Sequence, residues 1–181
     1  MTIETTMLLA EHASDTRLVA ELTAMANHAY AEGEKGLWSD GAARTSHSEM
    51  AELIAFGQIA VGRLDGEPVG LVRVHQLTPT LGEFGMLVAA AQHKGSGVGR
   101  ELVRFAEGRA RGRGLGTMQL ELLVPEVGTH PVKEFLRAWY TRLGYRVVGS
   151  GDVTEAHPDL APLLAVPCRF LVFHKDLAPG R

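Results

Sequence analysis

The sequence has a single cysteine, Cys168, among its 181 residues. One cysteine cannot form a disulfide within the chain and supplies no set of thiolates for a structural zinc site. The eight histidines are scattered, without the clustered spacing that metal ligation favours, so we expect no bound metal. The lack of disulfides fits a reducing compartment, and we expect a cytoplasmic protein.

Long apolar runs and a large net charge are also lacking. No apolar run approaches the roughly 18 residues needed to span a bilayer, and the N-terminus lacks the basic-then-apolar pattern of a secretion signal. The formal net charge is -3, so there is no overall basic surface for nucleic acid or for an anionic membrane. We therefore expect a soluble protein whose partners are small molecules or peptides.

What the sequence does have is the composition of one globular domain. Hydrophobic residues make up 45% and charged residues 22%, which is enough apolar material for a substantial core. We expect one domain over residues 1–181, with its central motifs at about 58–150 and a last strand at about 168–175. No internal repeat or low-complexity tract is present.

The apolar pattern predicts alternating strands and helices. Strands are predicted at residues 5–10, 58–64, 68–75, 83–89, 117–124, 145–148 and 169–174. Helices are predicted from residue 14 or 15 to 30, from 46 or 48 to 56, from 97 to 111, and from 133 to 143. A long surface loop is predicted at 32–45, and a Pro-rich stretch covers 152–167. One strand-helix-strand crossover among antiparallel pairings indicates an α/β fold with a mixed, mostly antiparallel sheet flanked by helices.

The most informative stretch lies at the predicted start of the third helix and reads Lys94-Gly95-Ser96-Gly97-Val98-Gly99-Arg100. Three glycines at alternate positions leave backbone N–H groups unobstructed at the positive end of a helix dipole, which favours a bound phosphate. The spacing differs from the G-x-G-x-x-G of dinucleotide-binding folds, and Gly99 is followed by Arg100 where a P-loop has lysine. A glycine-rich helix start without a ligand remains the alternative from these residues alone.

Two segments of the chain resemble motifs of the GNAT superfamily of N-acetyltransferases, which bind acetyl-CoA. The glycine turn resembles this family's pyrophosphate loop, usually written Gln or Arg, x, x, Gly, x, Gly or Ala, with Lys94 in the place of Gln or Arg. The segment from Leu136 to Tyr145 resembles the helix that ends in Tyr, three residues, Gly and an aromatic residue. The element order matches too, so the resemblance implies the acyl-CoA N-acyltransferase fold.

The resemblance also implies a site for acetyl-CoA as co-substrate. The backbone of the preceding strand would contact the pantetheine arm, and the glycine turn would hold the pyrophosphate. The implied cofactor-binding residues are Leu87, Val88, Ala89, Lys94, Gly95, Ser96, Gly97, Val98, Gly99 and Arg100. Tyr140 occupies the position of the family's general acid, which protonates the CoA thiolate. Many members carry an Asn after the fifth strand, whereas this chain has Gly128-Thr129-His130-Pro131, so that contact is not carried over.

The general base and the acceptor side are less constrained. Glu83 resembles, by position, carboxylates that some members use as a base, and an acidic residue in an apolar sheet favours a raised pKa. A solvated strand-end glutamate is the alternative for Glu83, and Glu121 and His75 are other candidate bases. In the loop at 32–45, Glu34 is a candidate to attract a cationic acceptor and Trp38 to stack on it. A solvated loop anchored by Trp38 is the alternative.

Together these features predict an enzyme that transfers the acetyl group of acetyl-CoA directly to a primary amine of a small molecule or peptide. A covalent role for Cys168 is not expected, because a cysteine with apolar flanks in a strand is usually part of the core. A non-catalytic acyl-CoA-binding or regulatory domain is the alternative. A nucleotide-dependent oxidoreductase and an RNA-modifying acetyltransferase are disfavoured. Many relatives pair through C-terminal strands, which implies a homodimer.

Overall fold

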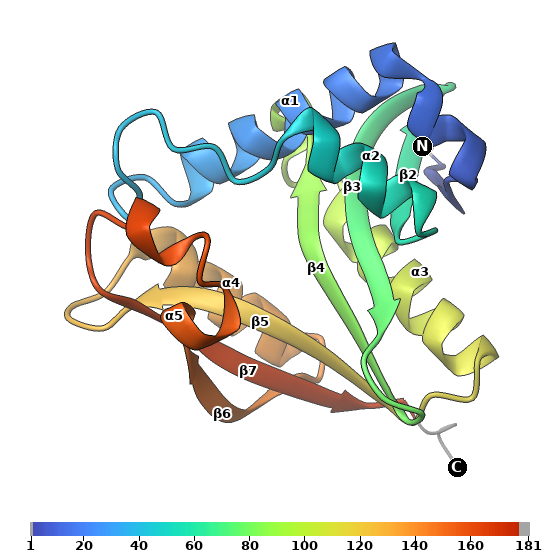
Figure 1. The fold of residues 1–181 in the computed structure, drawn as a ribbon. Coiled ribbons are helices and arrows are strands. Elements are labelled where there is room, and N and C mark those ends of the chain that lie inside the picture. The colour runs from blue at the N-terminus through green and yellow to red at the C-terminus, as the bar shows by residue number, and fades with distance from the viewer. Residues whose placement is uncertain (1, 178–181) are drawn as a thin grey trace.

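The structure is a computed structural model that describes residues 2–177 (Figure 1). One seven-stranded sheet runs through it in the order β1-β2-β3-β4-β5-β7-β6. Neighbouring strands are antiparallel except β4 and β5, which are parallel. This confirms the predicted mixed, mostly antiparallel sheet.

The strands are β1 (Glu4–Met7), β2 (Ile59–Leu64), β3 (Glu67–Gln76), β4 (Leu81–Ala89), β5 (Thr117–Pro125), β6 (Arg146–Asp152) and β7 (Cys168–Asp176). The helices are α1 (Thr16–Gly33), α2 (His47–Ala55), α3 (Val98–Gly112), α4 (Pro131–Arg142) and the short α5 (Val153–Ala156). Single 3-10 turns cover Ala10–Ser14, Ala91–His93 and Ala161–Leu163.

Local side-chain chemistry explains where the first two helices begin. The Asp15 carboxylate accepts a hydrogen bond from the Leu18 backbone N–H at the start of α1, and the Ser46 hydroxyl accepts one from the Glu49 N–H at the start of α2. These side chains satisfy backbone donors that a helix start leaves free. Both starts agree with the predictions from sequence.

Several predicted boundaries are wrong, and β4, for example, begins at Leu81 and not at residue 83. The first strand ends at Met7 and not at residue 10, because a 3-10 turn follows. α1 continues to Gly33, so the predicted loop at 32–45 begins later. β6 extends to Asp152, past two glycines that weaken a strand pattern. α4 begins at Pro131, where a proline is compatible with the first turn of a helix.

The helices cover the two faces of the sheet. α1 and α2 pack on one face of β2, β3 and β4 through an apolar cluster that includes Leu22, Met50 and Ile54. On the opposite face, α3 and α4 contribute to a larger cluster that includes Leu102 and Tyr140. Figure 1 shows these two layers on either side of the strands.

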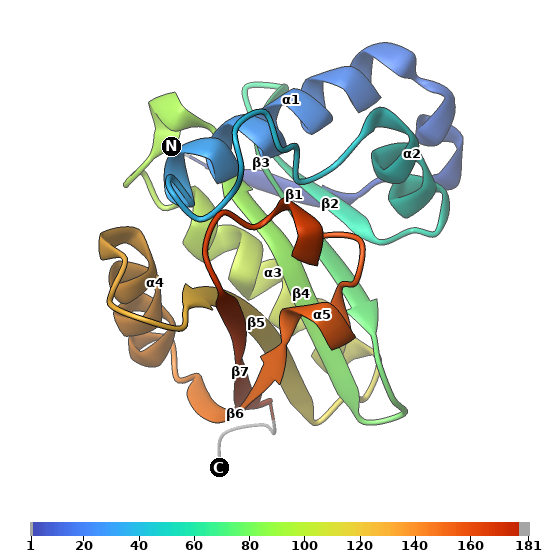
Figure 2. The same cartoon turned by 60° about the vertical axis from the view of Figure 1, so that its left-hand side comes forward.

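A third cluster lies where two distant loops meet. The loop after α1 and the segment around α5 run side by side in Figure 2, and Trp38 forms an isolated β-bridge with Leu164. Beneath them, Leu37 packs with Cys168 and Phe170. Cys168 is therefore a buried core residue, as its apolar flanks predict.

The sheet divides between β4 and β5. The two strands pair only from Leu81 to Glu83, and the arrows then diverge in Figure 1. In the same region β4 carries a bulge against β3, and Met86 adopts a φ of 47°, in the left-handed region. A bulge bends the strand that contains it. The part of β4 beyond Glu83 therefore lacks a partner on its β5 side.

Candidate functional site

A pocket of about 90 Å³ lies where β4 and β5 separate, and we call it the β4–β5 pocket. Its walls include Met86 and Leu87 of β4 and Leu122 of β5, with Tyr140 from α4 and Arg44 from the loop after α1. Backbone N–H and C=O groups of β4 face an unpaired edge here, so they are available to a ligand. The pocket thus combines free backbone groups with a few polar side chains.

A larger pocket, of about 330 Å³, lies near the start of β7 and is lined by residues such as Asp152, Thr154 and Cys168. None of the predicted site residues lines it. Another pocket, of about 480 Å³, lies along α3 beside Phe105 and Arg109 and is larger still. Both exceed the β4–β5 pocket in volume, but convergent polar chemistry selects the smaller one. We therefore assign the candidate site to the β4–β5 pocket.

The glycine turn forms a cradle of free backbone donors just beyond the end of β4. Gly95 and Gly97 have φ values of 79° and 93°, which an L-residue rarely adopts. Gly97 is the N-cap of α3. Within residues 2–177, the N–H groups of Gly97, Val98 and Gly99 donate to no protein acceptor. We call Gly95–Gly99 the glycine cradle, because its geometry suits an anion.

The structure limits how several predicted cofactor residues can act. The side chains of Val88 and Val98 are buried in the two apolar clusters, so only their backbone groups face a ligand. Lys94 and Arg100 are exposed beside the cradle. The Ser96 hydroxyl donates to the His93 carbonyl at 2.6 Å and so stabilises the turn itself.

Tyr140 lies inside the larger core and also borders the β4–β5 pocket. Its ring packs against Trp139, Phe84 and Phe173, with centroids 5.1 to 6.2 Å apart. Burial raises the pKa of the Tyr140 hydroxyl above its usual value. The phenol therefore keeps its proton at neutral pH, as a proton donor must. It is also a weaker acid than its reference pKa of about 10 indicates.

Glu83 lies at the closed end of the split, on the last pair of the β4–β5 ladder. Gln119 donates a hydrogen bond to its Oε2 at 2.7 Å, and the same Gln119 bonds His174 through its amide oxygen at 2.8 Å. Burial and, to a smaller extent, the negative charge of Glu121 raise the pKa of Glu83, while the Gln119 hydrogen bond, Arg73 and His157 lower it. A partly buried carboxyl with a raised pKa has the character of a general base.

The two alternative bases differ from Glu83. Burial and the nearby Arg73 lower the pKa of His75 to about 4, so its Nε2, 3.4 Å from Glu83 Oε1, carries no charge at neutral pH. That contact is not an ion pair, and His75 is a weak base. Glu121 borders the β4–β5 pocket, which Glu83 does not, and its Oε2 lies 3.3 Å from His157 Nε2. The structure thus brings Glu121 closer to the pocket than the sequence indicates.

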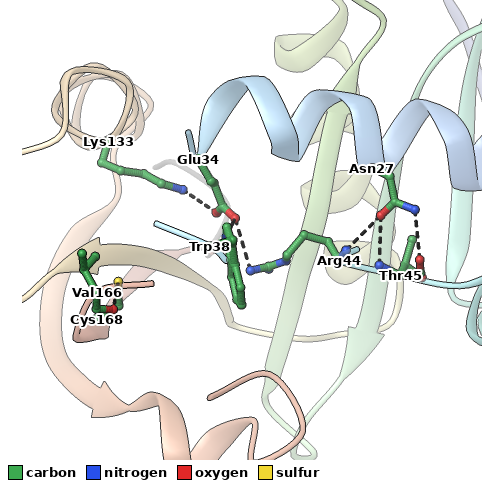
Figure 3. A network of polar contacts seen from close by, with 8 residues as sticks. All are labelled: Asn27, Glu34, Trp38, Arg44, Thr45, Lys133, Val166 and Cys168. Carbon is green, nitrogen blue, oxygen red and sulfur yellow. Dashed lines mark hydrogen bonds and ion pairs between the residues drawn. The ribbon is translucent and has the colours of Figure 1, made fainter. Parts of the chain in front are cut away.

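Glu34 and Trp38 belong to a polar network at the outer end of the pocket (Figure 3). Glu34 Oε1 accepts a hydrogen bond from Lys133 Nζ at 2.6 Å, and Oε2 accepts one from Trp38 Nε1 at 2.6 Å. Arg44 Nη1 lies 3.3 Å from the same Oε2. Glu34 and Lys133 are each only 4% exposed. The charge of Glu34 is therefore already compensated, and both of its carboxylate oxygens have partners. A direct role of Glu34 in attracting a substrate cation stays a prediction.

Sequence reasoning did not identify Arg44 or Lys133. Arg44 lies in a loop without periodicity, so nothing in its neighbourhood marks it. Lys133 does carry a signal, because it precedes Leu136 by three positions and Tyr140 by seven, which places it on the inward face of α4. A lysine on the apolar face of a helix indicates a buried partner.

Within the described residues, no group of three or more His, Cys, Asp or Glu side chains is placed to hold a metal ion. No helix in residues 2–177 is both long and apolar enough to span a bilayer.

Comparison with known proteins gives one family and many similar folds. The model of the Acetyltransferase (GNAT) family matches residues 19–145, which is more than half of the chain. An aminoglycoside 6'-N-acetyltransferase complexed with coenzyme A is 18% identical with a TM-score of 0.69, covering 100% of this chain and 99% of its own. The aminoglycoside 6'-N-acetyltransferase from Enterococcus faecium is 17% identical with a TM-score of 0.68 and the same coverage.

A third structure, yncA from Salmonella typhimurium with its cofactor acetyl-CoA, is 14% identical with a TM-score of 0.66, covering 100% of this chain and 97% of its own. At these identities the likeness shows the fold and leaves the substrate open. A search of curated protein sequences gives no match.

Proposed function

Because this chain belongs to the GNAT acetyltransferase family, we propose that it transfers the acetyl group of acetyl-CoA to a primary amine of a small molecule or peptide. The observation that carries the proposal is the course of β4. This strand borders Tyr140 in the β4–β5 pocket at Leu87 and leads, a few residues later, into the glycine cradle. The thioester end and the pyrophosphate end of acetyl-CoA would thus bind next to each other along β4.

The residues present fit acetyl-CoA. The backbone groups of Leu87 and Ala89 would bond the pantetheine arm at the unpaired edge of β4, and the free N–H groups of Gly97, Val98 and Gly99 would bind the pyrophosphate. Lys94 and Arg100 would add positive charge beside the phosphates. When bound, acetyl-CoA supplies an acetyl group activated as a thioester. CoA in one similar structure and acetyl-CoA in another support this assignment.

Each remaining requirement of the reaction has a residue in this chain. The amine nitrogen bonds to the acetyl carbon, the carbon–sulfur bond breaks, and the nitrogen loses a proton while the sulfur gains one. Tyr140 holds the proton that the departing sulfur takes up. Glu83 does not line the pocket, so it would accept the proton of the nitrogen through a water molecule. Backbone N–H groups of β4 would stabilise the carbonyl oxygen as it gains charge.

Two further expectations remain proposals. The outer strand β6 carries exposed Val147 and Val148, which supports pairing of two chains at this edge of the sheet. A cytoplasmic location rests on the amino-acid composition alone.

The proposed function is tested by amine-dependent release of free thiol from acetyl-CoA across amino acids, polyamines, antibiotics and peptides. A Gly97→Asp variant is expected to raise KM for acetyl-CoA about tenfold or more, because the left-handed backbone and the phosphate-binding N–H groups tolerate neither a side chain nor a negative charge. Gly57→Asp is the matched control, since Gly57 also has a positive φ of 65° but lies after α2. Binding of acetyl-CoA without turnover of any amine would favour a non-catalytic acyl-CoA-binding domain.

Replacing Gln119 with leucine is expected to move the acidic limb of the kcat/KM pH profile to higher pH. The Gln119 hydrogen bond lowers the pKa of Glu83, so its loss lets the carboxyl keep its proton to higher pH. A base works only when ionised, so activity at acidic pH falls. Both profiles are measured with one amine, whose own pKa is then common to them.

Glu121→Gln is the control variant, for which we expect the acidic limb to shift in the opposite direction. The negative charge of Glu121 raises the pKa of Glu83, so removing it is expected to move the same limb to lower pH. An acidic limb that stays in place in both variants would show that Glu83 is not the base.

A further inference from the structure

Arg44 has an unusual environment for an arginine in a loop. Its guanidinium lies 4.5 Å from the ring centroids of both Tyr30 and Trp38. Stacking of this kind fixes the plane of the guanidinium and leaves its edge, with the N–H donors, free. The side chain is only 15% exposed and borders the β4–β5 pocket.

One donor nitrogen of this guanidinium, Nη1, lacks a hydrogen-bond acceptor. Within residues 2–177, no acceptor lies in hydrogen-bond geometry to Nη1, although the Arg44 backbone N–H donates to Asn27 Oδ1. The Nη1 atom is buried, and the 3.3 Å contact with Glu34 Oε2 does not satisfy it. Buried donors without acceptors are costly, so such a group in a pocket indicates an acceptor that arrives with a ligand.

The charges around Arg44 point to the same kind of ligand. Glu34 is one negative charge beside two positive ones, and its strongest contacts are with Lys133 and the Trp38 indole (Figure 3). One positive charge is therefore in excess at this end of the pocket. An uncompensated charge in a buried place is unfavourable, and an anion bound there would offset it.

We propose that Arg44 binds a carboxylate of the acceptor, and that the acceptors are therefore compact amines that also carry a carboxylate, such as free amino acids. Tyr30 also lines the pocket, and its hydroxyl would be a second donor for that carboxylate. The amine then lies toward Glu121 and Glu83, at the negative end of the pocket. This inference rests on the proposed N-acetyltransferase function.

A polycationic acceptor fits this arrangement poorly. Aminoglycosides carry several amines and no carboxylate, so they would place positive charge against Arg44 and Lys133. Two of the structures described above are aminoglycoside acetyltransferases, but the likeness to them is one of fold. The volume of about 90 Å³ also favours a compact group at this position.

The test compares each of a set of amino acids with its carboxamide, at one pH, by thiol release from acetyl-CoA. The wild-type ratio of kcat/KM, acid over amide, is expected to fall about tenfold to a hundredfold in Arg44→Gln, the range for charge-assisted hydrogen bonds. Comparing ratios between proteins cancels the different basicity of the two amines. Arg44→Lys keeps the positive charge but lacks the planar guanidinium. Its acid-to-amide ratio of kcat/KM is expected to lie between those of the wild type and Arg44→Gln.

Arg146→Gln is the matched control, because it removes the same charge from an exposed pair on β6 and is expected to keep the wild-type ratio. Acetyl-CoA binding by each variant checks that it is folded. Turnover of amines with the same acid-to-amide ratio in wild type and Arg44→Gln would overturn the carboxylate site and leave the acetyltransferase standing. A lack of turnover of every amine would overturn both.

Discussion

Replacing Tyr140 with phenylalanine is expected to lower kcat about 10²- to 10⁴-fold, the usual contribution of a positioned general acid. The substitution removes only the hydroxyl, and the ring keeps its packing against Phe84 and Phe173. KM for acetyl-CoA should therefore change little. Steady-state kinetics with one amine over a range of acetyl-CoA concentrations measures both constants.

Tyr145→Phe is the matched control for this experiment. Tyr145 is also buried in the same aromatic group, but its hydroxyl donates to Glu107 at 2.9 Å, away from the pocket. Its loss should cost about 1 kcal/mol of stability and leave kcat within a few-fold of wild type. Undiminished turnover in Tyr140→Phe would remove Tyr140 as the acid.

Replacing Glu34 with glutamine is expected to lower the free energy of unfolding by about 3 to 5 kcal/mol, the range for removing one partner of a buried ion pair. Glutamine has nearly the same shape and still bonds Trp38, so the effect isolates the charge. Lys133 is only 4% exposed, and without Glu34 it and Arg44 become two neighbouring positive charges with no anion between them. Urea unfolding of variant and wild type measures the difference.

The exposed ion pair between Arg146 and Asp176 serves as the reference for that stability change. Asp176 lies 3.8 Å from Arg146, with both side chains more than 60% exposed, so Asp176→Asn should cost no more than about 1 kcal/mol. The double variant Glu34→Gln, Lys133→Met removes one of the stranded charges and is expected to recover part of the loss. A Glu34→Gln variant as stable as Asp176→Asn would mean that water screens the network.

The sequence predicts the parts of the site that depend on local spacing. The glycine cradle and Tyr140 can be recognised because each belongs to a short motif within one turn or one helix. The Lys133–Glu34 pair joins residues 99 positions apart, and the stack of Arg44 between Tyr30 and Trp38 depends on how a loop folds back on α1. No local pattern encodes such contacts, apart from the inward position of Lys133 on α4.

The division of the sheet was also not predictable from the residues that cause it. A bulge with a positive φ is usually marked by glycine, but here the residue is Met86. Its side chain packs against the apolar cluster under α1 and α2, which holds the bulge in place. The mostly apolar run over 83–89 predicts a regular strand and gives no sign of this departure.

The conformation of Met86 has a consequence for how this site tolerates change over evolution. A methionine in the left-handed region stores roughly 1 to 2 kcal/mol of backbone strain, which a glycine would release. Met86→Gly would release that strain, yet it would give up the side chain that packs under α1 and α2 and holds the bulge in place. Position 86 therefore combines two opposing requirements. A large side chain holds the bulge beside the site, and its left-handed φ costs backbone strain that lowers the stability of the fold.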